Sequence, residues 1–285
     1  MSKLRFNKKK HQYSVKNKVL TSVTQWIHFF FAEFDAKAMA KRLASFPVNK
    51  VKKKGVKFWL NEWKQSSIMG SLVHKEIEEA ILTKHMDKYP FTTTRAKNAL
   101  TWLNSYIKDL DNVRLYPEVV IYNERLGLAG TIDLLLLYGN NIVIVDWKTN
   151  KAINTTNKYN TFGITKVTKD LEDINYNHYT LQLNTYKYLL SNKDTMLSIN
   201  TLASNNITTN TSNKCNTNTC GIRNTNNNYY NNNIYNIYNN SNNILKLVHL
   251  EEYSITVYDI PDVKARISKM LKFWKQGSIP PSRMR

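Results

Sequence analysis

Residues 116–151 read YPEVVIYNERLGLAGTIDLLLLYGNNIVIVDWKTNK, a segment that contains two apolar runs. The runs cover residues 134–138 and 142–145, and Gly139 and Asn140 separate them. A glycine next to an asparagine suits the two-residue primed turn of a tight β-hairpin. The segment therefore predicts two antiparallel strands whose side chains are apolar on both faces.

This hairpin is expected to bring carboxylates together. If residues 138 and 141 close the turn, antiparallel pairing sets Asp133 opposite Asp146, with Cβ atoms roughly 4.5–5.5 Å apart. Because strand side chains repeat every two residues, Lys148 joins the face that carries Asp146. The segment 118–122 alternates and turns through 123–127, so a second hairpin would set Glu118 beside Asp133. The sequence thus predicts three acids and one lysine around one point.

Carboxylates so close together favour a bound cation. They raise one another's pKa unless a positive charge neutralises them, and hard oxygen ligands suit Mg²⁺ or Mn²⁺. The alternative is that Asp146 and Lys148 form an ordinary ion pair at a strand end and that Asp133 is a solvated acid near a turn. An isolated Asp-x-Lys favours this alternative, whereas the pairing with Asp133 across a defined turn favours the metal site.

The same residues resemble a known family. Glu118, followed by Gly-Thr-Ile-Asp at 130–133 and Asp-Trp-Lys-Thr at 146–149, is similar to the core of the PD-(D/E)XK nuclease superfamily, particularly its RecB-like exonuclease branch. The resemblance implies an α/β fold with a restriction-endonuclease-like core, in which a mixed central sheet is flanked by helices.

The resemblance also implies a role for each residue. In the family, two acids hold a divalent metal and a lysine assists the attacking water. Carried across, Asp133 and Asp146 are metal ligands and Lys148 is the catalytic lysine. The main-chain carbonyl of Trp147 is a candidate third ligand, and Glu118 is an additional ligand or an acid that orients the metal.

A histidine upstream fits the same pattern. Residues 66–83 predict an amphipathic helix that Ser66 or Ser67 caps, with His74 beside its apolar stripe. A lone histidine there is most often a core or supporting residue. In the RecB-like branch, a helix with a glycine and then a histidine one turn later precedes the catalytic hairpin, as Gly70 and His74 do here. The resemblance therefore implies that His74 is a metal ligand or orients the water.

A third match follows the hairpin. Residues 176–190 predict a helix with Gln182 and Tyr186 one turn apart, a pair that is normally surface or packing. In the RecB-like branch Gln-x-x-x-Tyr after the catalytic lysine is a signature, so Gln182 is expected to hydrogen-bond near the site and Tyr186 to contact a phosphate or hold the helix. The polar connection 148–169 is either a surface loop or a DNA-guiding loop, with Lys151 as a DNA contact.

The composition points to a polyanionic partner. The 285 residues include 41 Lys or Arg and 21 Asp or Glu, for a formal charge of +20. Such an excess favours nucleic acid, although a basic face can also bind an acidic protein or a membrane surface. The only cysteines, Cys215 and Cys220, exclude a disulfide framework and the four-cysteine iron–sulfur cluster of some family branches.

The chain is expected to be soluble and cytoplasmic. No segment approaches the roughly 20 apolar residues of a membrane span, and the N-terminus has neither a signal-peptide core nor a clear organellar presequence. A strand, then Ser-Val-Thr at 22–24 and Phe-Asp at 34–35 before a helix, resembles the start of phage and mitochondrial members of the RecB-like branch. This resemblance makes a phage-infected bacterium one expected setting for the chain.

Two further segments stand out. Residues 50–57, KVKKKGVK, form a basic loop that is either a solvated linker or a phosphate contact, and Phe58, Trp59 and Trp63 beside it suit base stacking or a core. Residues 192–243 are rich in Asn and Thr and predict a poorly ordered insertion within a single nuclease domain, 1–285.

The sequence therefore predicts an Mg²⁺- or Mn²⁺-dependent DNA exonuclease. It would hydrolyse phosphodiester bonds from DNA ends, with single-stranded ends favoured, in replication, repair or recombination. Two alternatives stay open: a structure-selective or restriction-like endonuclease with the same site, and a non-catalytic DNA-binding subunit that retains the fold.

Overall fold

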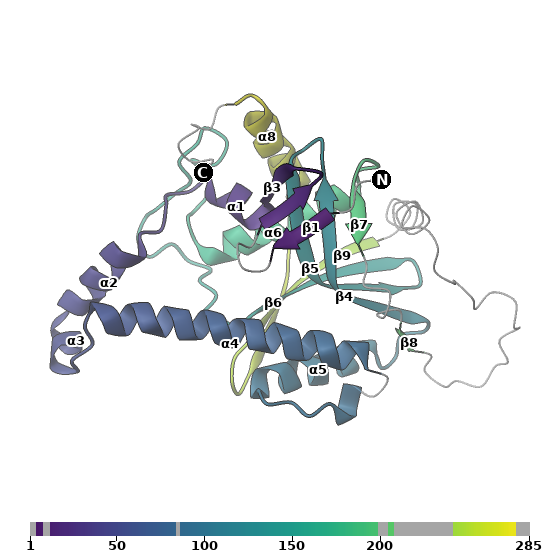
Figure 1. Ribbon diagram of the computed structural model, residues 1–285, viewed down its shortest axis with the longest axis horizontal. Helices are drawn as coiled ribbons and strands as arrows, with labels where there is room; N and C mark the ends of the chain where they lie inside the picture. Colours follow the sequence, from purple (N-terminus) through teal and green to yellow (C-terminus); the bar gives the residue numbers. More distant parts are fainter. Residues whose placement is uncertain (1–3, 8–11, 84–85, 199–204, 208–241, 278–285) are drawn as a thin grey trace, which may run out of the picture.

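The central feature of the chain is a mixed β-sheet with helices on both faces (Figure 1). The computed structural model describes residues 4–7, 12–83, 86–198, 205–207 and 242–277. Within these residues the strands are β1 (Leu4–Asn7), β2 (Gln12–Val15), β3 (Lys18–Ser22), β4 (Val113–Asn123), β5 (Leu128–Tyr138), β6 (Asn141–Lys148), β7 (Met196–Ser198), β8 (Asn205–Ile207), β9 (Asn242–Leu250) and β10 (Ile255–Asp259). The helices are α1 (Val23–His28), α2 (Ala36–Ser45), α3 (Pro47–Val51), α4 (Val56–Leu82), the short 3₁₀ helix η1 (Met86–Lys88), α5 (Thr94–Ile107), α6 (Asn175–Leu190) and α8 (Lys264–Lys275).

The sheet mixes parallel and antiparallel pairs. Its main path runs β1-β2-β3-β5-β6-β9-β10, and β4 covers the other edge of β5. The pairs β3–β5 and β6–β9 are parallel, whereas the remaining neighbours are antiparallel. The predicted α/β class, with a mixed central sheet flanked by helices, is confirmed.

Both predicted hairpins form in the expected register. Tyr138 pairs with Asn141 across Gly139, whose φ of 49° is easily adopted by glycine. The ladder ends at Leu134 and Val145, so the predicted pairing of Asp133 with Asp146 does not form. In the other hairpin, β4 and β5 pair on either side of position 118, so Glu118 lies opposite Asp133, as predicted.

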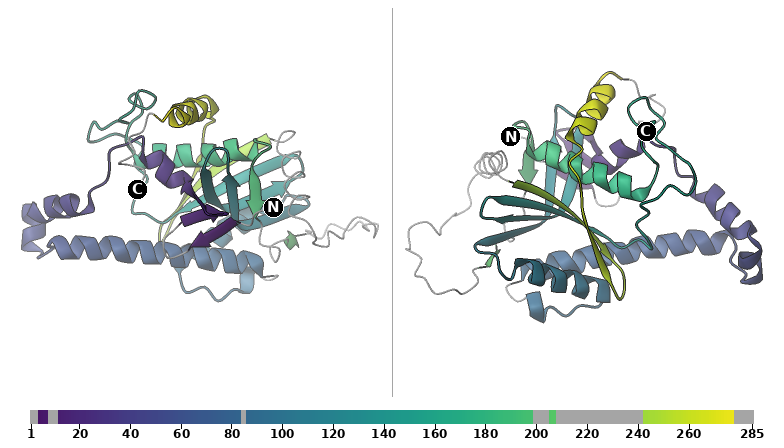
Figure 2. Two further views of the ribbon diagram at one scale, coloured as in Figure 1. Left: turned by 45° about the horizontal axis from the view of Figure 1, so that its top comes forward. Right: turned by 180° about the vertical axis from the view of Figure 1, so that it is seen from behind.

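Alternate side chains of the central strands enter two separate cores. On β5, Leu135 and Leu137 join the core under α1, α6 and α8, while Leu134 and Leu136 join the core under α4 and α5. Figure 2 shows these two helical layers on opposite faces of the sheet. Because both faces are buried, the strands are continuously apolar, and polar side chains within them mark the site.

The sheet splits next to the two central acids. β4 occupies one edge of β5 throughout, so β3 and β6 share the other edge, where β3 pairs at residues 128–129 and β6 at 134–138. No described strand pairs with that edge between these two stretches. Asp133 therefore lies at a fork in the sheet, where its backbone has no described strand beside it on that edge.

The helix α4 is longer than predicted. It begins at Val56 rather than at Ser66, so the prediction that Ser66 or Ser67 caps it is wrong. Ser66 Oγ donates instead to the carbonyl of Glu62, one turn earlier, and no Gly or Pro interrupts residues 56–69. The buried residues of α4 all follow position 72, so its first half extends beyond the sheet (Figure 1).

Other predicted elements are found with shifted ends. Ser22 caps α1 with a capping box completed by Gln25, and the predicted helix 176–190 corresponds to α6. The last described helix, α8, begins at Lys264. Within the predicted insertion 192–243, β7 and β8 pair with β4, while residues 199–204 and 208–241 lie outside the described residues.

Among described helices, none combines the length and apolarity needed to cross a membrane.

A buried carboxylate ties α4 to the start of α5. Glu76 Oε1 accepts hydrogen bonds from the amide of Thr92, at 2.8 Å, and from its hydroxyl. Its Oε2 accepts from the amide and the hydroxyl of Thr93, at 3.0 and 2.6 Å. Burial by itself would raise the pKa of Glu76, but these four hydrogen bonds outweigh burial and lower it.

Replacing Glu76 by alanine should reduce the free energy of unfolding by about 3 kcal/mol, because four donors lose their buried acceptor. Since the folded-state pKa is depressed, the stabilisation is present above the unfolded pKa and is lost as the pH falls through the folded one. Urea unfolding at pH 7 and pH 4 measures both effects. The control is Glu62→Ala on the same helix, and equal losses in the two variants would contradict this anchor.

Candidate metal centre

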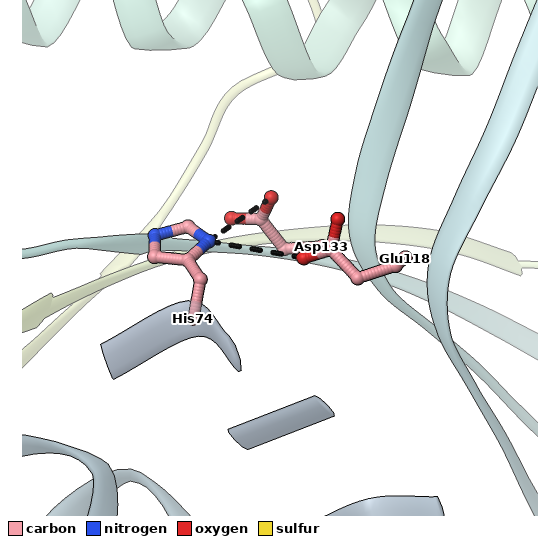
Figure 3. Close-up of side chains that lie close together, drawn as sticks. All are labelled: His74, Glu118 and Asp133. Atoms are coloured by element: carbon pink, nitrogen blue, oxygen red, sulfur yellow. Dashed lines mark ion pairs between the residues drawn. The ribbon is translucent and has the colours of Figure 1, made fainter. Parts of the chain in front are cut away.

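Three side chains from three elements converge at the fork in the sheet. His74 of α4 places Nδ1 3.6 Å from Asp133 Oδ1 and 3.9 Å from Glu118 Oε1 (Figure 3). One ligand atom from each residue lies within 4.8 Å of the others. One imidazole and two carboxylates, each partly accessible, form a donor set that suits a divalent cation.

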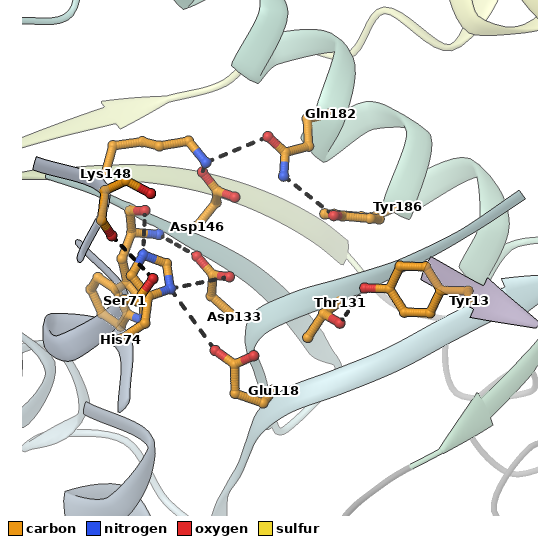
Figure 4. A network of polar contacts seen from close by, with 12 residues as sticks. Tyr13, Ser71, His74, Glu118, Thr131, Asp133, Asp146, Lys148, Gln182 and Tyr186 are labelled. Carbon is orange, nitrogen blue, oxygen red and sulfur yellow. Dashed lines mark hydrogen bonds and ion pairs between the residues drawn. The ribbon is translucent and has the colours of Figure 1, made fainter. Parts of the chain in front are cut away.

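The backbone of Glu118 is adapted to this position. Its φ is +48°, in the left-handed region that costs a non-glycine residue on the order of 1–3 kcal/mol. Residue 118 of β4 has no ladder partner among the described strands on either edge. On one edge, β5 pairs with residues 117 and 119 of β4. On the other edge, β7 pairs with residues 120–122 and β8 with residues 113–115. The free backbone permits the unusual φ, and the carboxylate points toward His74 and Asp133 (Figure 4).

The end of β6 orients the cluster. Asp133 Oδ2 accepts a hydrogen bond from the amide of Trp147 at 2.8 Å, and His74 Nε2 lies 3.1 Å from the Trp147 carbonyl. If Nε2–H donates to that carbonyl, the lone pair of Nδ1 faces the carboxylates, which is the usual arrangement of a metal-ligating histidine. At Gly70, α4 closely approaches Thr149, the residue that follows β6, because an added Cβ would lie 2.9 Å from Thr149 Oγ1.

Asp146 and Lys148 form a second group above the cluster (Figure 4). Lys148 Nζ lies 2.7 Å from Asp146 Oδ2, and the Asp146 side chain is only 2% exposed. Asp146 Oδ1 is buried and has no hydrogen-bond donor among the described residues. A buried carboxylate oxygen without a partner is costly, and a bound cation would satisfy it.

Asp133, Asp146 and Lys148 shift one another's pKa values. Burial, only partly offset by Lys148, raises the pKa of Asp146 to about 6. Burial also raises the pKa of Asp133, and the charge of His74 offsets part of that shift. Burial alone would lower the pKa of Lys148, but Asp146 and Asp133 outweigh burial and raise it. Lys148 is therefore a cation at neutral pH in the metal-free protein.

His74 is also held in its protonated form by the acids around it. Burial alone would lower the pKa of its imidazole, but Asp133 and Glu118 outweigh burial and raise it to about 9. A divalent cation would take the place of this proton between the same acids, so metal binding is expected to release protons near pH 7.5.

The metal-free protein should lose stability as the pH rises from 6.5 to 9. The pKa of His74 is higher in the folded protein than in the unfolded chain. The stability that this difference provides is complete below pH 6.5 and is lost as the pH rises past 9. Urea unfolding in a chelator at pH 6.5, 7.5 and 9 measures this loss. In His74→Gln the loss over this window should disappear, and an unchanged slope in that variant would assign the titration to another group.

Gln182 and Tyr186 of α6 continue the network away from the cluster (Figure 4). Lys148 Nζ donates to Gln182 Oε1 at 3.4 Å, and Gln182 Nε2 donates to the Tyr186 hydroxyl at 3.2 Å. Tyr186 is 3% exposed, and its ring packs on Gly130, where an added Cβ would lie 2.6 Å from Tyr186 Cε1. This geometry places Tyr186 behind the site, where it supports the helix, and its contact with a phosphate stays a prediction.

The structure adds one residue that the sequence did not indicate. The Tyr179 ring lies with its centroid 4.6 Å from Lys148 Nζ, so Lys148 is held between Asp146, Gln182 and this ring. Tyr179 precedes Gln182 by three residues and so lies on the same face of α6. The three-residue spacing between Tyr179 and Gln182 is the sequence feature that could have indicated a role for Tyr179 at the site. Lys151, by contrast, is exposed in the connection after β6 and is not part of the hydrogen bonds, ion pair and ring contact that hold Lys148 among the described residues.

The candidate metal ligands can now be placed together. His74, Glu118 and Asp133 form one compact set, and Asp146 contributes the buried oxygen that has no donor. The Trp147 carbonyl faces His74, so its role as a metal ligand stays a prediction. With Lys148 beside these acids, the site combines oxygen and nitrogen ligands for a divalent cation with a fixed positive charge.

No family model matches this chain. A stretch of 86 residues is 34% identical to RecBCD enzyme subunit RecB of Buchnera aphidicola subsp. Schizaphis graminum (strain Sg). The match covers 30% of this chain and 7% of the length of RecB, so the chain is similar to a small part of that protein. This partial similarity agrees with the resemblance of the motifs to a nuclease superfamily.

Proposed function

We propose that this chain is a metal-dependent DNA exonuclease that hydrolyses phosphodiester bonds from DNA ends, with single-stranded ends preferred, in replication, repair or recombination. The observation that carries the proposal is the convergence of His74, Glu118 and Asp133, with Asp146 and Lys148 alongside. The formal charge of +20 and the partial similarity to RecB support a nucleic-acid substrate.

The acids and the histidine are the proposed ligands. Mg²⁺ or Mn²⁺ bound there would polarise a phosphoryl oxygen and lower the pKa of a water molecule in the site. Asp133 and Asp146 supply the negative charge that attracts the cation, and Glu118 and His74 complete its surroundings. The amide of Trp147 holds Asp133 in place, because it donates to Oδ2 and leaves Oδ1 facing His74.

Lys148 acts as a fixed cation in this mechanism. Because Asp146 and Asp133 raise its pKa despite burial, its main task is to place the attacking water and to stabilise negative charge that develops on the phosphate. Tyr179 and Gln182 keep its ammonium group in position. A role in deprotonating the water requires that the bound cation first lower the pKa of Lys148.

The remaining parts of the proposal concern the substrate and the chain as a whole. Gln182, Tyr186 and Lys151 are proposed to support or contact DNA near the site. Residues 1–285 are proposed to form a single nuclease domain that contains the insertion 192–243. The proposed setting is the cytoplasm.

Digestion of end-labelled linear DNA beside a covalently closed circle tests this function. Wild-type protein with Mg²⁺ should degrade the linear DNA and leave the circle intact. Asp133→Asn, which keeps an oxygen for the Trp147 amide but removes the charge, should degrade neither. Cutting of the circle would favour a structure-selective or restriction-like endonuclease with the same site. Folded protein that binds both DNAs but cuts neither would favour a non-catalytic DNA-binding subunit.

A further inference from the structure

The chain carries a helical arm that takes no part in the two cores of the sheet. The arm consists of residues 36–69, which form α2, α3 and the first half of α4. Figure 1 and both views of Figure 2 show these helices projecting beyond the sheet. Its packing is internal, between α2 and α4, and Ala40 is its one fully buried residue.

The arm is much more basic than the rest of the chain. Its 34 residues contain nine Lys or Arg and one acid, Glu62, so it carries +8 of the total charge of +20. Eight of these basic side chains are exposed, and Lys54 is half-buried against the rings of Phe58 and Trp59. Among the ion pairs of the described residues, none involves a basic residue of the arm. This charge is therefore not neutralised within the described chain and is available to a polyanion.

The continuous helix α4 connects this charge to the metal centre. Lys57, Lys64 and Ser71 recur every seven residues, so they lie along one face of the helix with a drift of about 20° per step. Ser71 lies next to the cluster, less than one turn before His74 (Figure 4). At about 1.5 Å per residue, Lys64 lies about 15 Å and Lys57 about 25 Å from His74 along the axis.

The connection that follows Lys148 reaches the same arm. The guanidinium of Arg42 on α2 lies 5.9 Å from the ring centroid of Tyr159, whose side chain is 75% exposed. The segment that leaves the catalytic lysine and the helix that carries His74 thus both extend to the arm. A nucleic-acid strand that enters the site along α4 and this connection would pass the basic side chains of the arm.

We infer, on the basis of the proposed nuclease function, that the helical arm binds the sugar–phosphate backbone of the substrate outside the scissile site. The arm holds a stretch of nucleic acid that lies about 15–25 Å from the metal centre, roughly four to seven nucleotides at about 3.4 Å each along one strand. It contributes to affinity and to retention of the substrate, and it takes no part in bond cleavage.

The test replaces three exposed arm lysines in one variant, Lys52→Gln, Lys57→Gln and Lys64→Gln. Binding of a fluorescent single-stranded 30-mer is measured in a chelator over a range of salt concentrations. The variant should bind at least tenfold more weakly at 0.15 M salt, and the slope of log K against log salt should fall by about two. A variant with wild-type affinity and salt dependence would overturn the inference.

The matched control removes the same charge from α8, with Lys269→Gln, Lys272→Gln and Lys275→Gln. These lysines are exposed, and the helix α8 that carries them lies away from the arm (Figure 1). The α8 variant should keep wild-type affinity for the 30-mer. Equal weakening in both variants would mean that only net charge matters and would also overturn the inference.

Cleavage gives a second readout that separates the arm from the site. On the 30-mer the arm variant should show a KM raised about tenfold with kcat unchanged. A dinucleotide spans only about 7 Å and cannot reach Lys64, so both proteins should cut it equally. A loss of kcat on the dinucleotide would contradict a role restricted to binding. If wild-type protein cuts nothing, the proposed function fails. The salt dependence of 30-mer binding, measured in a chelator, then still decides whether the arm binds nucleic acid.

Discussion

Asp146→Asn is expected to slow metal-dependent DNA cleavage by at least about 1,000-fold and to leave DNA binding nearly unchanged. The change keeps the shape of a side chain that is 2% exposed, but it removes a negative charge that faces both the proposed metal site and Lys148. A thousandfold corresponds to about 4 kcal/mol of transition-state stabilisation, which is within the contribution of a metal site. Single-turnover digestion of end-labelled DNA measures the rate.

The control for Asp146→Asn is Asp109→Asn, a change at a side chain that is 84% exposed. The control should cleave at the wild-type rate. Binding of DNA in a chelator should be equal in all three proteins, because the basic surface is unchanged. Cleavage by Asp146→Asn within tenfold of wild type would remove Asp146 from the catalytic site.

Lys148→Met is expected to reduce cleavage by about 100- to 10,000-fold without weakening metal binding. The methionine fills the space of the lysine stem but lacks the cation that positions the water and stabilises charge on the phosphate. Removal of a positive charge next to the acids should favour cation binding, whereas Asp146→Asn should weaken it. Cleavage rates, together with Mn²⁺ titrations followed by electron paramagnetic resonance, distinguish the two roles.

The stability of Lys148→Met must be measured in parallel. Loss of Lys148 leaves Asp146 buried without its counterion, which can cost about 3–5 kcal/mol. Lys246→Met is the matched control, because it also breaks a lysine–aspartate pair within the sheet, between Lys246 of β9 and Asp259 of β10. A folded Lys148→Met protein with wild-type cleavage would contradict the catalytic role of this lysine.

Much of the candidate site could be predicted because local sequence determines strand register. The Gly139-Asn140 turn sets the pairing of β5 with β6, and the turn after Asn123 sets that of β4 with β5. These two registers place Glu118 beside Asp133 and fix the positions of Asp146 and Lys148. The roles of these residues in catalysis stay predictions.

Features that depend on tertiary packing could not be predicted in the same way. Tyr179 has no motif, and it acts on Lys148 only because α6 packs across the end of β6. The fork beside Asp133 arises because β3, from the start of the chain, pairs parallel with β5. No local pattern in residues 128–138 contains that information.

The start of α4 shows how an incorrect local interpretation can conceal a larger element. Ser66 and Ser67 resemble N-caps, but a serine inside a helix can bond to the carbonyl one turn earlier, as Ser66 does with Glu62. The helix therefore continues back to Val56 and carries Lys57 and Lys64 in line with the site. Within the basic segment 50–57, residues 52–55 form the predicted loop, whereas residues 50–51 end α3 and residues 56–57 begin α4.

The position of a bound cation tests the central claim most directly. Crystals grown with Mn²⁺ can be measured at a wavelength where manganese scatters anomalously. The account predicts a peak within coordination distance of His74 Nδ1, Glu118 and Asp133, with Asp146 facing it. A fully soaked crystal with no peak at these residues, or with its strongest peak elsewhere, would contradict the assignment of this cluster as the metal centre.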